Sequence, residues 1–284
     1  MVQWFEERLY PDFSALYQVG QVVYQDKSEH QDLIIFDHDR FGRILALDSI
    51  IQLTTSDEFI YHEMMSHLPI LAHGDAKRVL IIGGGDGGVL RHCLMHSGVE
   101  QVTQVEIDQS VIDLCVEYLP MISQGAFDHE KARVVIADGA KFVAESAKTD
   151  ERFDVIVIDS TDPVGPGRVL FDPSFYQAAV GCLTEQGVIV TQSGVPLWEP
   201  ESSKLTHDGL KPLVEDFTFY RAPVPTYVGG DMLLGWGSKS QTVRQTELSV
   251  LTERFNKAGL VTKFYTPAVH QGAFALPPAY LAHL

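Results

Sequence analysis

The chain has 284 residues, of which 45% are hydrophobic, so it is long enough to bury one large core or two unequal ones. Its formal net charge is −17 and it has no basic run long enough to follow a phosphate backbone, which argues against a nucleic-acid-binding protein. No apolar run approaches the ~18 residues of a membrane-spanning helix.

The cysteines and the N-terminus indicate a cytoplasmic protein. Cys93, Cys115 and Cys182 are scattered without the spacing of a metal site, and an odd number of cysteines without a motif is typical of reduced thiols. The polar, acidic start of the chain lacks the basic and apolar regions of a secretory signal. We therefore expect a cytoplasmic location.

Residues 1–72 are expected to form a small N-terminal antiparallel β domain. Short runs rich in β-forming residues alternate with polar turns, a spacing typical of hairpins; they are Gln21–Tyr24, Leu33–Phe36, Arg43–Leu47 and Ile50–Leu53. Residues 57–67 then show helical periodicity, and His73-Gly74 closes the segment. On that helix Met64, Met65 and Leu68 are expected in the core.

Residues 73–284 are expected to form a second domain in which strands alternate with helices, as in a doubly wound parallel α/β sheet. The expected strands are Val79–Ile82, Val102–Ile107, Arg133–Ala137, Asp154–Ile158 and Gly187–Thr191. Between them we expect helices at Asp108–Tyr118 and Asp172–Leu183, with Asp108 as an N-cap. Residues 217–224 and 232–236 read as two late strands.

The turn after the first strand of this domain indicates a nucleoside ligand. Gly83, Gly85 and Gly88 fit the pattern GxGxxG, and Glu106 follows where an acidic residue would hold ribose hydroxyls. Asp86 in the turn would repel the pyrophosphate of a dinucleotide, which normally binds at the helix N-terminus. A cationic nucleoside would be attracted instead.

Carboxylates stand at four consecutive strand ends, where ligands bind in open α/β sheets. They are Asp86, Glu106, Asp138, Asp159 and Asp162. Each has an ordinary structural explanation as a helix cap, a solvated charge or a turn residue. Together they would repel one another at close range unless a cation lay among them, so we expect a cation pocket. No motif indicates a metal: His92 and His96 have ligand spacing but no evident third ligand.

These features resemble the spermidine synthases, which are polyamine aminopropyltransferases. The segments that carry the resemblance are colinear; they are Gln31–Phe36, Asp57–Met65, Gly83–Gly88, Val105–Asp108, Asp138-Gly139, Asp159–Pro163 and Pro225–Tyr227. The resemblance implies a Rossmann-like methyltransferase-type domain behind the N-terminal β domain, in a homodimer or homotetramer. It implies transfer of an aminopropyl group from decarboxylated S-adenosylmethionine to putrescine, giving spermidine and methylthioadenosine. Both small molecules are substrates, and no cofactor is implied.

The resemblance also implies residue roles. Asp159 would be the proton acceptor, and the donor nucleoside would contact Gln31, Asp86, Glu106, Asp138, Gly139 and Pro166. The polyamine would contact Tyr61, His62, Asp159, Asp162, Gln192 and Tyr227. For the far amine of the acceptor the sequence leaves Glu199, Glu201 and Asp208 open.

The chemistry explains why such residues are needed. The donor is a sulfonium, so its leaving group is a neutral thioether, whereas the acceptor amine has a pKa of ~10 and must lose a proton at a cost of about 4 kcal/mol at pH 7. A desolvated Asp159 crowded by Asp162 would have a raised pKa and take that proton. Alternatively, the neutral amine binds directly and Asp159 holds the product ammonium.

Two other functions fit part of the pattern. A methyltransferase that uses S-adenosylmethionine shares the fold, the glycine turn and the ribose acid, but Asp86 would repel the carboxylate of that donor. A non-catalytic homologue that binds polyamines or nucleosides would not require both Asp159 and Asp162.

Overall fold

The structure is a computed structural model that describes residues 2–163 and 165–284, with only the backbone described at residues 165 and 166. The N-terminal strands are β1 (Gln3–Glu7), β2 (Ala15–Val19), β3 (Gln21–Lys27), β4 (Asp32–His38), β5 (Gly42–Leu47) and β6 (Ile50–Thr54). The later strands are β7 (Arg78–Gly83), β8 (Gln101–Glu106), β9 (Ala132–Ile136), β10 (Phe153–Asp159), β11 (Leu183–Gln192), β12 (Asp216–Ala222) and β13 (Met232–Ser238).

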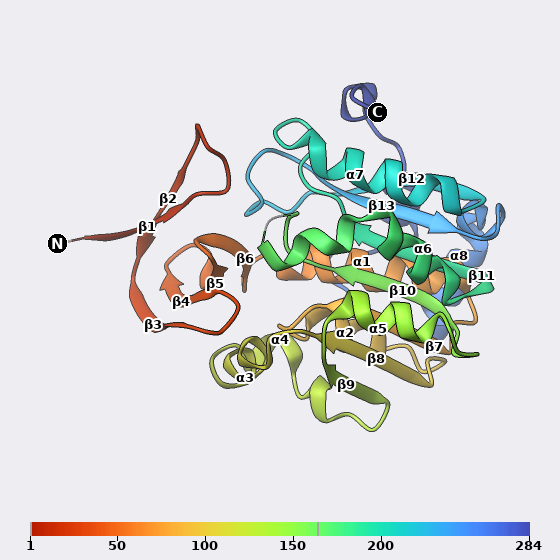
Figure 1. Ribbon diagram of the computed structural model, residues 1–284, viewed down its shortest axis with the longest axis horizontal. Coiled ribbons are helices and arrows are strands. Elements are labelled where there is room, and N and C mark those ends of the chain that lie inside the picture. The colour runs from red at the N-terminus through yellow and green to blue at the C-terminus, as the bar shows by residue number, and fades with distance from the viewer. Residues whose placement is uncertain (1, 164) are drawn as a thin grey trace.

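The α-helices follow in chain order: α1 (Glu58–His73), α2 (Gly88–Leu94), α3 (Gln109–Tyr118), α4 (Pro120–Ser123), α5 (Gly139–Ser146), α6 (Pro173–Gly181), α7 (Pro200–Leu210), α8 (Leu248–Ala258) and α9 (Pro267–Ala273). Short 3-10 helices lie at Ala126–Asp128, Gly165–Phe171, Lys211–Leu213, Val243–Gln245 and Pro278–Leu281. The N-terminal strands lie to one side of a large α/β layer structure (Figure 1).

The large sheet has the strand order β12-β13-β11-β10-β7-β8-β9. The five strands from β11 to β9 are parallel, as the alternation of strands and helices predicted, and β13 and β12 add an antiparallel edge. The chain reverses its direction of winding between β7 and β10, where Gly83 is paired with Asp159. In open α/β sheets this switch point is where ligands bind.

Alternate residues of the parallel strands face opposite sides of the sheet, so each side has its own core. Val79, Ile81 and Val157 pack with α1 and α2, while Leu80, Ile82 and Ile156 pack with α5 and α6. Because both faces are covered, β7 and β10 contain continuous apolar runs, Val79–Ile82 and Val155–Ile158.

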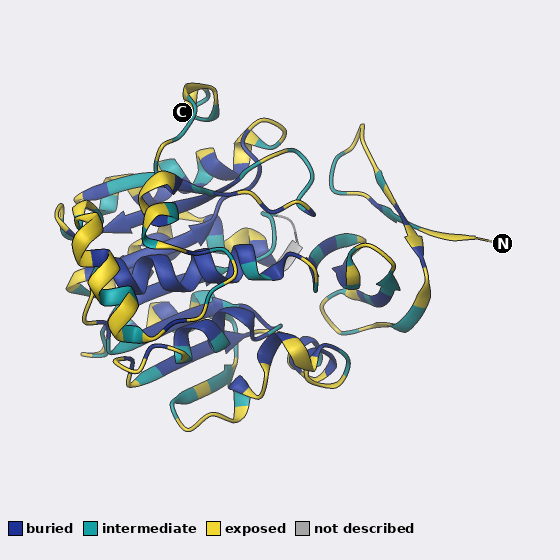
Figure 2. Ribbon diagram, turned by 180° about the vertical axis from the view of Figure 1, so that it is seen from behind, coloured by how far each residue is buried: buried dark blue, intermediate teal, exposed yellow. Residues whose placement is uncertain are grey.

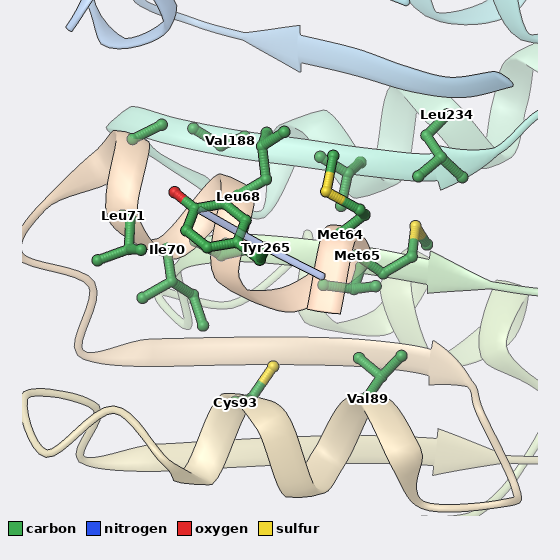
Figure 3. Close-up of a cluster of buried hydrophobic side chains, with 14 of the residues drawn as sticks. Met64, Met65, Leu68, Ile70, Leu71, Val89, Cys93, Val188, Leu234 and Tyr265 are labelled. Atoms are coloured by element: carbon green, nitrogen blue, oxygen red, sulfur yellow. The ribbon is translucent and has the colours of Figure 1, made fainter. Parts of the chain in front are cut away.

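Helix α1 is buried along most of its length, and it packs on the large sheet with α2 beside it (Figures 2 and 3). Met64, Met65 and Leu68 are fully buried, which confirms the sequence prediction. Glu63 is buried on the same helix, and its carboxylate accepts hydrogen bonds from the backbone N–H groups of Lys263, Phe264 and Tyr265. These bonds fix the segment after α8 against α1.

The N-terminal strands form two small antiparallel sheets, β1-β2 and β3-β4-β5-β6. The hairpins from β3 to β6 were predicted, but the β1-β2 pair was not. The four-stranded sheet packs through residues such as Ile35 and Leu45 against Leu114 of α3, which links it to the large domain. Asp108 is the N-cap of α3 as predicted, accepting a hydrogen bond from the backbone N–H of Ser110.

The predicted division at residue 72 stays a prediction, since α1 extends from the N-terminal sheets onto the large sheet. In residues 2–163 and 165–284, no helix combines the length and the apolar character needed to span a bilayer.

Candidate active site

A cavity of about 750 Å³ lies at the switch point of the large sheet, facing the N-terminal strands. Its floor is made by the carboxyl ends of β7, β8 and β10, and its opposite wall includes Glu7, Tyr10 and Gln31 of the N-terminal domain. The site is therefore assembled from both parts of the chain.

The cavity brings together nearly all the residues that were expected to bind ligands. Its lining includes Gln31, Tyr61, His62, Gly83, Gly85, Asp86, Glu106, Asp138, Gly139, Asp159, Asp162, Gln192 and Tyr227. Gly88 lies behind this surface. The expected contact of Pro166 with the nucleoside falls on a side chain outside the described part of the structure.

At two positions of the turn the structure shows why the residue is a glycine. Gly83 has a φ of +86°, and a Cβ there would collide with the backbone carbonyl of Asp159 on the neighbouring strand. A Cβ on Gly88 would overlap the imidazole ring of His62. The glycine turn thus lets the strand end and the first turn of α2 approach the reacting region closely.

Asp159 is partly buried at the end of β10, and its Oδ1 accepts a hydrogen bond from the hydroxyl of Tyr61 at 2.8 Å. Its Oδ2 has no hydrogen-bond partner among the described residues. Burial and the charge of Asp86 raise the pKa of Asp159 to about 7, although His62 and Tyr61 oppose the shift. Asp86, rather than the expected Asp162, is thus the neighbouring carboxylate that raises this pKa.

Glu106 is also buried, and its Oε1 accepts a hydrogen bond from the backbone N–H of Asp108 at 2.9 Å. Burial raises its pKa to about 7, although backbone bonds from Asp108 and Ile107 oppose the shift. Gln31 donates a hydrogen bond to Asp108 at 3.2 Å, so the N-terminal domain contacts this strand end directly. Asp138 caps α5 by accepting bonds from the backbone N–H groups of Ala140 and Lys141.

A second group of polar side chains lies on the other side of Asp159. Gln192 donates a hydrogen bond to Asp162 at 3.2 Å and accepts one from the backbone N–H of Gly194. The ring of Tyr227 packs edge-on against that of Tyr61, and its hydroxyl donates to the backbone carbonyl of Gln52 at 2.6 Å. Burial raises the pKa of Tyr227 well above its usual value, so it lines the cavity as a neutral phenol.

The comparisons with known proteins agree with this geometry. Residues 58–247 match the family model described as the spermine/spermidine synthase domain, and residues 3–55 match the spermidine synthase tetramerisation domain. A polyamine aminopropyltransferase of Ruegeria sp. (strain TM1040) is 53% identical over 96% of this chain and 95% of its own length. Polyamine aminopropyltransferase 1 of Pseudomonas aeruginosa is 50% identical over 96% and 94%.

The chain belongs to the spermine/spermidine synthase family. Members of the family with solved structures share the whole fold. A crystal structure of a spermidine synthase in complex with the transition-state analogue AdoDATO has a TM-score of 0.92 and 35% identity, covering 99% of this chain and 96% of that one. The spermidine synthase of Thermotoga maritima has a TM-score of 0.86 and 34% identity, covering 97% and 91%. The predicted family and fold class are confirmed.

The sequence left three acidic residues open as partners of the acceptor's far amine, and only one of them lines the cavity. Glu199 lines the cavity, whereas Glu201 and Asp208 are exposed and do not. Burial and the charge of Asp162 raise the pKa of Glu199 to about 7. Glu7, at the end of β1, also lines the cavity and was not predicted, because nothing in its local sequence distinguishes it from Glu6.

His92, on α2, and His96, just after its end, have the spacing of metal ligands, but the structure gives them a different role. His92 and His96 each share a hydrogen bond with His67 of α1, at 3.2 Å and 2.9 Å. Across the described ranges, no group of three or more His, Cys, Asp or Glu side chains has the arrangement of a metal site.

Proposed function

We propose that this chain transfers the aminopropyl group of decarboxylated S-adenosylmethionine to putrescine, producing spermidine and methylthioadenosine. The observation that carries the proposal is the concentration of carboxylates around one cavity at the switch point. Asp86, Glu106, Asp159 and Asp162 come from three strand ends, and Glu7 and Glu199 add to them from the opposite side. A nucleoside dication and a diammonium compound together supply the positive charge that such a cavity attracts.

The donor fits the side of the cavity built by β7 and β8. Glu106 would accept bonds from both ribose hydroxyls, as in nucleoside sites of this topology. The adenine would lie against Asp138 and Gly139, with Gln31 covering it from the N-terminal domain. The ammonium at the end of the aminopropyl group would then reach Asp86.

The acceptor fits the side built by β10 and β11. Its attacking amine would lie between Asp159 and Tyr61, with Tyr227 beside them, since both ring nitrogens of His62 face carboxylates. Asp162 and Gln192 would hold the chain of the diamine, and Glu7 and Glu199 would hold its far ammonium. The neutral phenols and the buried carboxylates leave little water to compete for the amine.

The catalytic step follows from the raised pKa of Asp159. The attacking ammonium has a pKa of ~10.4, judged from lysine, so its transfer of a proton to an ordinary aspartate would be uphill by about six units. A pKa of about 7 for Asp159 removes about half of that cost. The free amine then displaces the neutral thioether in line with the C–S bond, and no acid is needed for the leaving group.

The proposal also includes the oligomeric state and the cellular compartment. The match of residues 3–55 to a tetramerisation domain supports a homo-oligomer, for which the chain would be a homodimer or a homotetramer. We place the reaction in the cytoplasm, with no cofactor beyond the two substrates. Cys93, Cys115 and Cys182 are free thiols, which supports a reducing compartment.

One assay tests the activity. Purified protein is mixed with decarboxylated S-adenosylmethionine and putrescine, and spermidine and methylthioadenosine are quantified by chromatography. Equal amounts of the two products are expected, and none should form when intact S-adenosylmethionine replaces the donor. A methylated amine from intact S-adenosylmethionine would contradict the proposal and favour a methyltransferase.

A further inference from the structure

The imidazole of His62 lies between two carboxylates from different elements. Its Nδ1 is 2.6 Å from Oε2 of Glu58, one turn earlier on α1, and its Nε2 is 3.4 Å from Oδ1 of Asp86 in the glycine turn. His62 and Glu58 are both buried. Because each ring nitrogen faces a carboxylate oxygen, both can donate only if the ring is an imidazolium.

The charges around His62 favour that imidazolium. Burial alone would lower the pKa of His62, but Asp86 and Glu58 raise it to about 10. The ring is therefore a cation at neutral pH, among carboxylates that would otherwise repel one another. The charged and titratable groups that face it or act on its partners are Glu58 and Tyr61 of α1, Asp86 of the glycine turn, Arg91 and His92 of α2, Asp159 of β10 and Lys263.

Glu58 is held in place from its other side by Arg91, whose Nη2 is 3.5 Å from Oε2 of Glu58. The same nitrogen donates to Nε2 of His92 at 2.8 Å, which places the proton of His92 on Nδ1. His92 then donates to His67, and His67 to His96. Burial lowers the pKa of all three of these histidines, so they stay neutral and the only imidazolium of the group is His62.

The imidazolium has a direct effect on Asp86. Oδ1 of Asp86 accepts a bond from the backbone N–H of Gly88 at 2.6 Å and faces His62, so this oxygen is fully engaged. Oδ2 has no hydrogen-bond partner among the described residues, and Asp86 lines the cavity. One oxygen of the carboxylate is thus held by the protein, and the other remains available to a ligand.

We propose that Glu58 is a positioning residue for aminopropyl transfer: by holding His62 as an imidazolium, it keeps the carboxylate of Asp86 in the orientation that receives the ammonium of the donor. This inference rests on the proposed function. Glu58 does not touch either substrate, and its effect on the reaction passes through His62. The ordinary structural alternative is that Glu58 only ties α1 to α2 through Arg91.

Steady-state kinetics with a matched control separate these roles. Glu58→Gln removes the charge and keeps the shape, so His62 loses its proton at high pH and the KM for the donor rises. We expect the KM for the donor to rise about tenfold at pH 9, which corresponds to the loss of one charge-assisted bond. The rise should be smaller at pH 6, where His62 stays protonated. Glu58→Asp keeps the charge and should restore most of the donor affinity. Glu63→Gln, an equally buried change on the same helix, should lower thermal stability but leave the KM for the donor unchanged at both pH values.

A double-mutant cycle tests the route of the effect. If Glu58 acts through His62, then Glu58→Gln in a His62→Gln background changes the KM for the donor less than twofold, because the second change has nothing left to remove. The same fold loss in both backgrounds would overturn the proposal and support the structural alternative.

NMR of the wild-type protein gives a readout that does not depend on a variant folding. The imidazole nitrogen signals of His62, assigned by their loss in His62→Gln, should show an imidazolium up to at least pH 9. A titration near the ordinary histidine value of ~6.5 would overturn the proposal. The proposal would also be overturned if Glu58→Gln bound the donor as tightly as the wild type from pH 6 to 9. The proposed function fails separately, if the wild-type protein turns over no donor at all.

Discussion

Replacing Asp159 by asparagine should remove the proton acceptor and transfer the pH dependence of the reaction to the amine itself. Burial and Asp86 raise the pKa of Asp159 from 3.8 to about 7, which brings it closer to the ~10.4 of the amine by about three units. At 1.36 kcal/mol a unit, this lowers the cost of proton transfer by about 4 kcal/mol. The wild-type rate should therefore fall as the pH drops through 7 and be flat above it.

Without Asp159, only amine that is already neutral can attack. A positioned general base contributes about 10²–10⁴ to a rate, so kcat of Asp159→Asn should fall at least ~100-fold at pH 8. The remaining rate should then rise about tenfold per pH unit up to pH ~10. Release of methylthioadenosine, measured at saturating substrates from pH 6 to 10, gives both profiles. Asp162→Asn is the matched control, because it should raise the KM for putrescine and keep the flat profile.

Three results would refute this reasoning. One is a variant within a few-fold of the wild type at pH 8. Another is a slow variant whose rate does not depend on pH. The third is a wild-type rate that itself rises tenfold per unit up to pH 9, which would show that the neutral amine binds directly and that Asp159 only holds the product ammonium.

Three further predictions concern the donor side of the cavity. Glu106→Gln should weaken the donor and methylthioadenosine equally, by about 1–3 kcal/mol, because both keep the ribose; calorimetry that shows either one unchanged would contradict the assignment. Intact S-adenosylmethionine should bind at least ~30-fold more weakly than its decarboxylated form, and Asp86→Asn should narrow this gap; equal affinities for the wild type would disprove the charge argument. Gly88→Ala should displace the ring of His62 and lower both the melting temperature and donor affinity, whereas Gly98→Ala, where a Cβ meets nothing within 4 Å, should change neither.

The large sheet and the candidate site could be predicted together, because both follow from the local sequence of each strand and of the residues at its end. Each buried parallel strand is short and rich in apolar residues, and the acidic residue at or just after its end marks the edge where ligands bind. Asp86, Glu106 and Asp159 could therefore be grouped from their positions alone. The pattern also separated a cationic ligand from a dinucleotide, since Asp86 stands where a phosphate would need a positive dipole.

Other parts depend on contacts between distant segments and left no local signal. Strand β1 has the sequence Gln-Trp-Phe-Glu-Glu, which does not alternate, so neither the strand nor the contact of Glu7 with the cavity could be predicted. The pairing of Glu58 with His62 is visible as an i,i+4 spacing on α1. The role of this pair cannot be predicted from the spacing, because the second carboxylate that faces His62, Asp86, comes from another element.

The buried carboxylates also have a thermodynamic consequence for ligand binding. Asp159, Glu106 and Glu199 each have a pKa of about 7, so at neutral pH each is protonated in part of the molecules. A dication that enters favours the ionised forms and expels these protons into the solvent. Donor affinity should therefore increase from pH 6 to 8, and the heat of binding should depend on the ionisation enthalpy of the buffer. The site thus exchanges protons for substrate cations, and the number released in calorimetry counts the carboxylates that the substrate engages.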